Sequence, residues 1–299
     1  MKNLIGKNEK AYRDQLNGIY NINDKNEIFY LTDDQVYSAF DLYWNEHCKT
    51  KENEEQPTFT LVVAQPGSGK TSLVNKIKNL NNNIMISDVD EFRKYHPNFN
   101  LFKDSENFAS YTQNFALTFS FLLMARCIDT KHSILIEATL RNTNKMINNI
   151  QLAKENNFKI NTHFLIAKKE DSMLGVYYRA LLMLENNLIP RITPIEVHNG
   201  SCEGIKNFLN NQNNIDLIDN IYIYNRSLIQ LNKINLKDKN EILNIIENEL
   251  NRKQSKNELN ELKKQKIAIN KNKNQLLKYI STKLNEINVE IFKKTIALK

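Results

Sequence analysis

Residues 59–73 read FTLVVAQPGSGKTSL, and this stretch decides the fold. Its first part, 59–64, is a compact apolar run of the kind that forms a strand buried on both faces. Its last part continues into 72–78, which has the composition and spacing of a helix. The segment between them is rich in Gly, Pro and Ser, so the chain turns sharply there. The predicted local structure is therefore a strand, a glycine-rich loop and a helix.

The glycine-rich loop has the pattern of a Walker A phosphate-binding loop. Gly67 and Gly69 allow the backbone to curl, so that successive N–H groups form an anion nest at a helix N-terminus. Lys70 supplies positive charge to the β- and γ-phosphates of ATP, and the Thr71 hydroxyl is placed to coordinate Mg²⁺. Ala64 replaces the first glycine of the motif, which a strand end with negative φ tolerates. We predict nucleotide binding here, in preference to a turn that binds nothing, by Gln65, Pro66, Gly67, Ser68, Gly69, Lys70, Thr71 and Ser72.

Further apolar runs follow along the chain, at 84–86, 134–136, 164–167 and 221–224. They are separated by segments in which apolar residues recur at helical intervals. Alternating strands and helices are typical of a parallel sheet. The predicted fold class is thus α/β, with a P-loop kinase-like parallel sheet covered by helices on both faces.

The segments on either side of this core differ from it in pattern. Thr32 and Gln35 have the spacing of a capping box that begins a helix. We predict an N-terminal helical segment and linker at 1–56, a P-loop kinase core at 57–236 and a helical, Lys/Asn-rich C-terminal extension at 237–299. The extension is interpreted as a solvated helical appendage rather than an arm that binds nucleic acid.

Composition and charge narrow the class of protein. The chain of 299 residues has 41 Lys and Arg against 34 Asp and Glu, and this excess is spread out rather than gathered into one basic block. A nucleic-acid partner is therefore not indicated. Cys48, Cys127 and Cys202 lack the spacing of a disulfide framework or a zinc site. The sequence shows neither a secretory signal nor an apolar run of membrane-spanning length, so we expect a cytoplasmic protein without membrane contact.

Acidic residues follow the second predicted strand. The carboxyl ends of parallel strands are where open α/β sheets place their ligands. A kinase that acts on a hydroxyl needs a base to accept its proton, and Asp90 is the predicted base. Asp88 and Glu91 are equally well explained by capping of the following helix. His96, directly before Pro97, is interpreted as a structural turn residue.

Several motifs in one order give the chain a resemblance to a known family. They are QPGSGKTSL at 65–73, the D-x-D-x-F and H-P-N-F string at 88–99, IEATLR at 136–141, Arg179 with RITP at 191–194, YNR at 224–226 and ELNRK at 249–253. With these motifs the chain resembles the zeta toxins, toxin-antitoxin kinases that phosphorylate UDP-N-acetylglucosamine. The resemblance covers about 55–255.

The resemblance implies roles for particular residues. The family's general base falls on Asp90, and its two phosphate-binding arginines fall on Arg179 and Arg191, with one residue fewer between them here. Its substrate-contacting Glu and Thr fall on Glu137 and Thr139, with Arg141 close by in the sequence. The resemblance further implies ATP and Mg²⁺, a sugar-nucleotide substrate and a small antitoxin protein that covers the nucleotide site. These assignments also agree with the chemistry, because guanidinium groups stabilise the charge that spreads over a transferring phosphoryl group.

One departure bears on the substrate. The family carries an acidic residue on the helix before the third strand, whereas 119–123 reads FSFLL and has no carboxylate. The substrate is therefore less firmly implied than the kinase chemistry.

Two other functions stay open. The chain could be another P-loop kinase, acting on a different small molecule or on a polynucleotide, or an NTP-binding interaction module without catalysis. A polynucleotide kinase needs a basic, aromatic-lined groove, and no clustered basic and aromatic segment stands near the motifs. A non-catalytic module has no need of a carboxylate base with two arginines. Asp90, Arg179 and Arg191 therefore favour the kinase.

Overall fold

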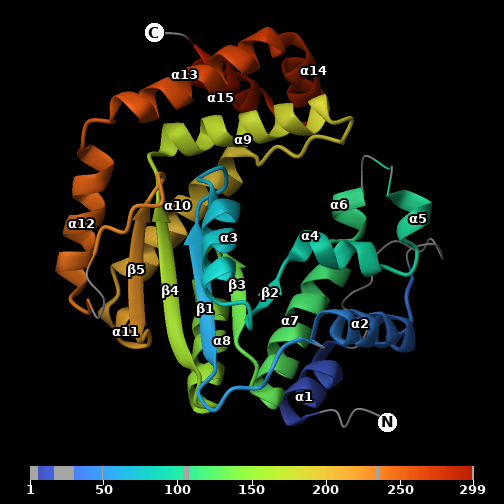
Figure 1. Ribbon diagram of the computed structural model, residues 1–299. Coiled ribbons are helices and arrows are strands. Elements are labelled where there is room, and N and C mark those ends of the chain that lie inside the picture. Colours follow the sequence, from blue (N-terminus) through green and yellow to red (C-terminus); the bar gives the residue numbers. More distant parts are fainter. Residues whose placement is uncertain are drawn as a thin grey trace. The chain divides into compact units, whose positions relative to one another are not determined.

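The computed structural model describes residues 6–16, 30–48, 50–103, 105, 108–232 and 236–297 (Figure 1). Its contacts divide the chain into two compact units. The first comprises Met1–Thr60, Asn81–Glu137 and Leu152–Lys159, and the second comprises Leu61–Leu80, Ala138–Gln151 and Ile160–Lys299. Each unit is described by itself below. The predicted limits at 57 and 237 stay a prediction.

Five strands form a parallel sheet with the order β2-β3-β1-β4-β5. The strands are β1 (Thr58–Ala64), β2 (Met85–Ser87), β3 (Ile134–Ala138), β4 (Lys159–Ile166) and β5 (Asn220–Asn225). Ile86 of β2 pairs with Leu135 of β3, and Phe164 of β4 pairs with Ile223 of β5. Each of the five strands overlaps one of the predicted apolar runs, although β4 begins five residues before its run. The predicted α/β fold with a parallel sheet is confirmed.

Helices make up most of the rest of the chain. The first unit holds α1 (Lys7–Leu16), α2 (Asp33–Cys48), α4 (Val89–Phe92), α5 (Phe99–Phe102), α6 (Phe108–Tyr111) and α7 (Gln113–Thr130). The second unit holds α3 (Lys70–Leu80), α9 (Lys169–Glu185), α10 (Ile195–Leu209), α11 (Gln212–Asp216), α12 (Lys239–Asn251), α13 (Lys256–Lys271), α14 (Lys273–Lys283) and α15 (Glu286–Ile296). Helix α8 (Thr143–Glu155) runs from the second unit into the first. In the described part of the chain, no helix combines the length and the hydropathy of a membrane span.

The N-terminal helices are integral to the first unit. The capping box predicted at the start of α2 is present, because the Gln35 N–H donates to Thr32 Oγ1 and the Thr32 N–H donates to Gln35 Oε1. Glu9 of α1 is 1% exposed and accepts two bonds of 2.6 Å from the Arg126 guanidinium of α7. Removal of either partner of such a buried ion pair would leave the other charge buried and unpaired, which strongly destabilises a protein. This pair therefore joins α1 to α7.

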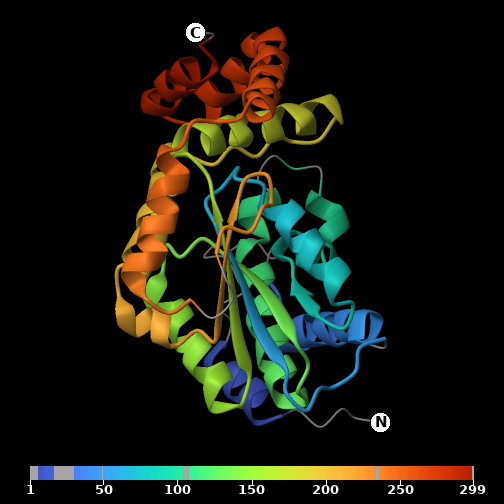
Figure 2. The ribbon, with the colours of Figure 1, turned by 60° about the vertical axis from the view of Figure 1, so that its left-hand side comes forward.

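The C-terminal helices correct the interpretation of 237–299 as a solvated appendage. In Figures 1 and 2, α13 and α15 lie beside α9, and contacts join both helices to it. Buried side chains of α13, α14 and α15 form one apolar cluster with α9 and the first residue of α10, made up of Met173, Leu174, Val176, Tyr177, Ala180, Leu181, Ile195, Ile269, Leu276, Ile280, Phe292 and Ile296. The predicted helical stripe is helical, but it is a packing face and is broken into separate helices at Asn272 and Leu284. The extension thus forms part of the second unit's core.

Candidate active site

The predicted phosphate loop has the backbone of an anion nest. Gly67 and Gly69 have φ angles of 77° and 101°, in the left-handed region that glycine adopts without strain. Ser68 between them is fully buried, and its Oγ atom donates to the Gln65 carbonyl at 2.7 Å. The loop ends at Lys70, the first residue of α3, where the positive end of the helix dipole favours an anion. This geometry is suited to binding phosphate.

The Gln65 side chain attaches the phosphate loop to the end of β4 and to α9. Its Nε2 atom donates to the Ala167 carbonyl and to Ser172 Oγ, both at 2.9 Å. Ser172 Oγ in turn lies 2.8 Å from Nε2 of His198, which is fully buried in α10. Burial lowers the pKa of His198, so the neutral imidazole is favoured in this contact. The loop is therefore held to β4, α9 and α10 by buried polar contacts.

Helix α9 packs directly on the phosphate loop. A Cβ atom on Gly175 would overlap the Gly67 carbonyl oxygen, and a Cβ atom on Gly67 would overlap the backbone of Ser172 and Val176. Residues three or four apart share one face of a helix, so Ser172, Gly175 and Arg179 follow each other along this face. Arg179 therefore lies on α9 one helical turn after Gly175, the residue that meets the loop.

Lys70, Thr71 and Ser72 form the first turn of α3. Thr71 and Ser72 are exposed, and Lys70 is partly exposed. Mg²⁺ commonly takes one or two protein oxygens together with substrate phosphates and waters. The Thr71 hydroxyl at the open end of a phosphate nest fits such an ion. In the described residues no group of three or more His, Cys, Asp or Glu side chains could hold a metal ion.

The two predicted phosphate arginines lie on different kinds of structure. Arg179 is on α9, and its Nη2 atom donates to Thr193 Oγ1 at 3.4 Å. Arg191 lies in the non-helical stretch before α10. Pro190 and Pro194 flank this stretch, and proline lacks the N–H that a helix interior uses.

The C-terminal helices hold the stretch that carries Arg191. The Tyr279 hydroxyl of α14 donates to the Pro190 carbonyl at 2.5 Å. Asn288 of α15 accepts from the Ile195 N–H at 2.8 Å. These bonds lie on either side of Arg191, so the extension positions a predicted site residue.

In the first unit, Asp88 and Asp90 have different roles. Asp88 is the N-cap of α4, and its carboxylate accepts the N–H groups of Asp90 and Glu91. Asp90 leaves 53% of its side chain exposed and accepts from Arg93 Nε at 3.3 Å. The capping interpretation of Asp88 is confirmed by these bonds, whereas about half of the Asp90 side chain is exposed.

No sequence motif assigns a role to Arg93, yet it contacts the predicted base. It is 5% exposed and also donates to the Ala109 carbonyl, to Thr112 Oγ1 and to Gln113 Oε1, at 2.6 to 2.7 Å. Its guanidinium therefore joins Asp90 to the start of α7. The only sequence signal is its i, i+3 spacing from Asp90 on a short helix.

His96 belongs to the turn that follows. Its Nδ1 atom accepts from the Asn98 N–H at 3.1 Å, and its ring packs on Phe115 with the centroids 4.7 Å apart. Burial lowers the pKa of His96 to about 4, so the ring is neutral near pH 7. These contacts support the prediction of a structural residue.

The predicted substrate residues follow one another at the end of β3. Glu137 lies within the strand in the first unit, while Thr139 and Arg141 follow it in the second unit. Leu140 between them has a positive φ of 54°, and the close approach of its carbonyl leaves no room for a Cβ on Gly204 of α10. Arg141 is exposed, and its Nε atom lies beside Gly200. The loop after β3 thus packs on α10.

The stretch that lacks the family's carboxylate lies on α7. There Ser120 Oγ forms a hydrogen bond of 2.7 Å with Ser87 Oγ at the end of β2. A neutral hydroxyl pair therefore occupies this part of the first unit.

Comparisons with known proteins agree on one family. The family model described as Zeta toxin matches residues 44–246. Toxin zeta of Streptococcus pyogenes is 28% identical over 251 residues, which cover 82% of this chain and 88% of that protein. Toxin PezT of Streptococcus pneumoniae serotype 4 is 28% identical over 208 residues, covering 67% of this chain and 81% of PezT.

A solved structure shows the same fold. It comes from work on the PezAT chromosomal toxin-antitoxin system of Streptococcus pneumoniae and superposes with a TM-score of 0.69 at 21% identity, covering 84% of this chain and 99% of that one. The resemblance based on the motifs is thereby confirmed. The chain belongs to the zeta toxin family, with its P-loop kinase-like fold.

Proposed function

We propose that this protein is a kinase that transfers the γ-phosphate of ATP, with Mg²⁺, to a hydroxyl of UDP-N-acetylglucosamine. The observation that carries the proposal is the phosphate loop with α9 packed on it. Gly67 and Gly69 supply the nest, Lys70 stands at its helix end, and Arg179 lies one turn beyond the contact with Gly175. These are the parts that phosphoryl transfer requires: a phosphate cradle and cationic groups for the developing charge.

In the proposed reaction, Asp90 is the general base. The acceptor hydroxyl gives its proton to the Asp90 carboxylate while its oxygen forms a bond to the γ-phosphorus. The bond between that phosphorus and the β–γ bridging oxygen breaks, and ADP leaves. Arg179 and Arg191 stabilise the negative charge on the transferring group, and Glu137, Thr139 and Arg141 bind the sugar nucleotide. Thr71 is the proposed Mg²⁺ ligand.

A protein partner is part of the proposal. The PezAT structure comes from a toxin-antitoxin system. We propose that this chain, too, has a small antitoxin partner that covers the nucleotide site and blocks phosphoryl transfer.

The acceptor can be tested directly. Purified protein is incubated with ATP and Mg²⁺ and with sugar nucleotides, nucleosides, aminoglycosides or short oligonucleotides, and the products are analysed by mass spectrometry. We expect UDP-N-acetylglucosamine to gain one phosphate fastest, and Lys70→Ala to abolish the reaction. Phosphate transfer only to an oligonucleotide or an aminoglycoside would contradict the substrate assignment but not the kinase fold.

A further inference from the structure

We infer that the second unit binds a long-chain aliphatic carboxylate, such as a free fatty acid, in a cavity between α9, α13 and α15. The cavity has a volume of about 790 Å³. Small-molecule sites have volumes of roughly 300 to 1,000 Å³, so the space is large enough for one organic ligand. Residues of the phosphate loop do not line the cavity, so this site is separate from the proposed nucleotide site.

Aliphatic side chains form the inner part of the cavity. Met173 and Leu174 of α9 and Ile195 of α10 line it and belong to the buried apolar cluster. Leu262 of α13 and Ile291 of α15 also line it and pack against the same cluster. None of the described residues that line the cavity is aromatic. Flat rings are commonly bound by stacking on aromatic side chains, so this lining favours a flexible methylene chain instead.

Helix α13 presents apolar and basic residues to the cavity on one face. Positions i, i+3, i+4 and i+7 share a face of a helix, and here they are Leu259, Leu262, Lys263 and Lys266. Lysine side chains lie along apolar surface while their ammonium groups stay in water. Lys266 Nζ donates to the Ala297 carbonyl, just after α15, at 3.3 Å. Positive charge therefore lies next to the apolar lining.

The charge around the cavity is complementary to an anion. Two carboxylates, Glu170 and Asp171, line the cavity together with four lysines, which are Lys169, Lys263, Lys266 and Lys294. The Asp171 carboxylate already accepts from Gln254 Nε2 at 2.5 Å. Exposed ion pairs contribute little affinity each, whereas each buried methylene contributes roughly four-fold. The lysines therefore select the anionic head group, and the chain supplies most of the affinity.

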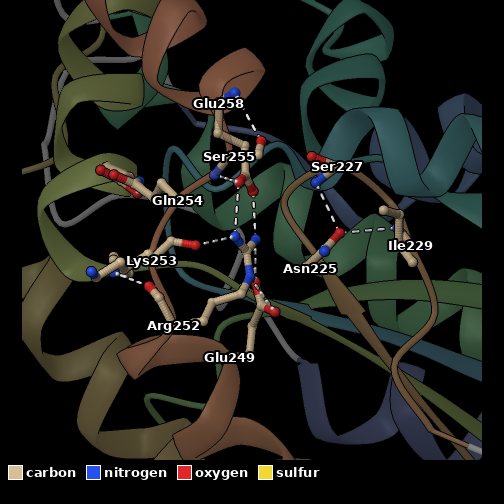
Figure 3. A network of polar contacts seen from close by, with 11 residues as sticks. Asn225, Ser227, Ile229, Glu249, Arg252, Lys253, Gln254, Ser255 and Glu258 are labelled. Atoms are coloured by element: carbon tan, nitrogen blue, oxygen red, sulfur yellow. Dashed lines mark hydrogen bonds and ion pairs between the residues drawn. The ribbon is translucent and has the colours of Figure 1, made fainter.

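The junction between α12 and α13 holds one end of the cavity in place (Figure 3). Gln254, which lines the cavity, lies in this junction. Arg252 pairs with Glu249 of α12 and with Glu258 of α13, at 2.8 and 2.5 Å. Lys168 Nζ donates to the Arg252 carbonyl at 2.9 Å. These bonds tie the start of α13 to the start of α9, so the space between the two helices is a defined part of the fold.

A free carboxylate fits the cavity better than a membrane surface does. Binding to a membrane surface requires an apolar face that can enter the lipid. Met173 and Leu174 are buried and cannot enter a bilayer. A single aliphatic chain that enters the cavity can contact both of them.

The test compares ligands that differ in charge or in chain length. Dodecanoate, decanoate and dodecyltrimethylammonium, each below its micelle-forming concentration, are titrated by calorimetry into the full chain. Dodecanoate should bind about ten-fold more tightly than decanoate, because two more methylenes are buried. The cation should bind at least about ten-fold more weakly than dodecanoate, because like charges repel. No binding of dodecanoate, or equal binding of the anion and the cation, would overturn the inference.

Two pairs of variants on α13 locate the site. Leu259→Gln should raise the Kd of dodecanoate by about five-fold or more, and Lys263→Glu by about three-fold or more at low ionic strength. Ile267→Gln and Lys264→Glu are the matched controls, because both side chains are exposed and lie outside the lining. They should change the Kd by less than about two-fold. Equal losses in the controls and in the cavity variants would mean that dodecanoate binds elsewhere.

Two further measurements exclude other binding modes. Lys70→Ala should bind dodecanoate as the wild type does, whereas a loss of binding in this variant would assign the carboxylate to the phosphate loop and overturn the inference. Sedimentation with phosphatidylglycerol vesicles tests a membrane surface. If the protein binds these vesicles but not monomeric dodecanoate, the lysines bind lipid head groups and the cavity site is wrong.

Discussion

The Gly67 carbonyl oxygen occupies the space in which a Cβ on Gly175 would stand. Gly67 belongs to the phosphate loop and Gly175 to α9, so the absence of a side chain at 175 is what allows the helix to meet the loop. Arg179 continues the same helix face one turn later. The helix that carries Arg179, a predicted catalytic residue, is thereby packed against the phosphate loop, the predicted nucleotide site.

The first prediction tests this contact by Gly175→Ala. The added methyl group must push α9 from the loop, and overpacking of this kind costs about 1 to 3 kcal/mol. We expect ATP affinity to fall by roughly ten-fold, measured by calorimetry, since about 1.4 kcal/mol corresponds to that factor. Gly200→Ala is the control, because a Cβ there has Arg141 Nε as its nearest neighbour at 3.6 Å, an ordinary contact. Equal ATP affinities in the wild type and Gly175→Ala would show that the contact does not matter to the site.

The second prediction concerns Arg93 as a positioning residue for Asp90. Arg93→Lys keeps the charge but cannot replace the planar guanidinium that bonds Asp90, Ala109, Thr112 and Gln113 together, so Asp90 loses its orientation. We expect kcat to fall by about ten-fold or more while ATP affinity stays unchanged. In an Asp90→Asn background the same substitution should have little further effect, which a double-mutant cycle measures.

Lys94→Gln provides the control for Arg93. Lys94 is 58% exposed and pairs with Glu91 at the surface, where ion pairs contribute little. An additive loss of kcat in the double mutant would mean that Arg93 acts independently of Asp90.

The third prediction follows from the lowered pKa of His96. Its folded-state pKa is about 4, whereas an unperturbed histidine has a pKa of about 6.5. Between these values the unfolded chain takes up a proton that the folded chain does not, so the free energy of unfolding falls as pH decreases from about 6.5 to about 4. In the His96→Gln variant the free energy of unfolding should fall less between pH 7 and pH 5, as measured by urea denaturation at pH 7, 6 and 5. Burial also lowers the pKa of His163 to about 4, so His163 should retain part of the pH dependence of stability in the variant.

NMR titration gives the direct measurement for His96. The wild-type resonance that is missing from His96→Gln should titrate with a midpoint near 4. A midpoint near 6.5 would contradict the buried, neutral ring.

The fourth prediction tests the packing of the C-terminal helices. Phe292 of α15 is fully buried and meets Tyr177 of α9 edge to face, with the ring centroids 4.9 Å apart. Phe292→Ala should lower the free energy of unfolding by about 3 to 5 kcal/mol, as for other large-to-small changes in a core. Ile287→Ala on the same helix is the control, because Ile287 is 58% exposed. If chemical denaturation shows equally small losses of the free energy of unfolding for Phe292→Ala and Ile287→Ala, the extension is a solvated appendage after all.

Much of the fold could be predicted from local patterns. The strands have short apolar runs because both faces of a parallel sheet are buried, and the phosphate loop has a spacing that few other structures require. Where polar residues are buried, the pattern failed: β4 begins at Lys159, before the predicted run, and includes buried Thr162 and His163. The His163 ring stacks on Tyr222 of β5, a contact between strands far apart in the sequence.

The site was predictable only in part, for a similar reason. Motif spacing identified the phosphate loop, and it predicts Asp90 and the two arginines as site residues because their chemistry needs particular residue types. The contacts that hold them involve distant residues with no motif of their own, such as Gly175 on the loop and Tyr279 beside Arg191. Helical periodicity predicted the helices of the C-terminal extension, but not that they pack against α9.

The most direct test of the account is single-turnover transfer of labelled γ-phosphate from ATP to UDP-N-acetylglucosamine by the wild type, Asp90→Asn and Asp88→Asn. If Asp90 is the base, Asp90→Asn lowers the transfer rate by at least roughly 100-fold and keeps ATP affinity within a few-fold, because a positioned base is lost. Asp88→Asn should transfer nearly as fast as the wild type, since asparagine caps a helix as aspartate does. A large loss with Asp88→Asn but not with Asp90→Asn, or no labelled sugar nucleotide from the wild type, would contradict the account.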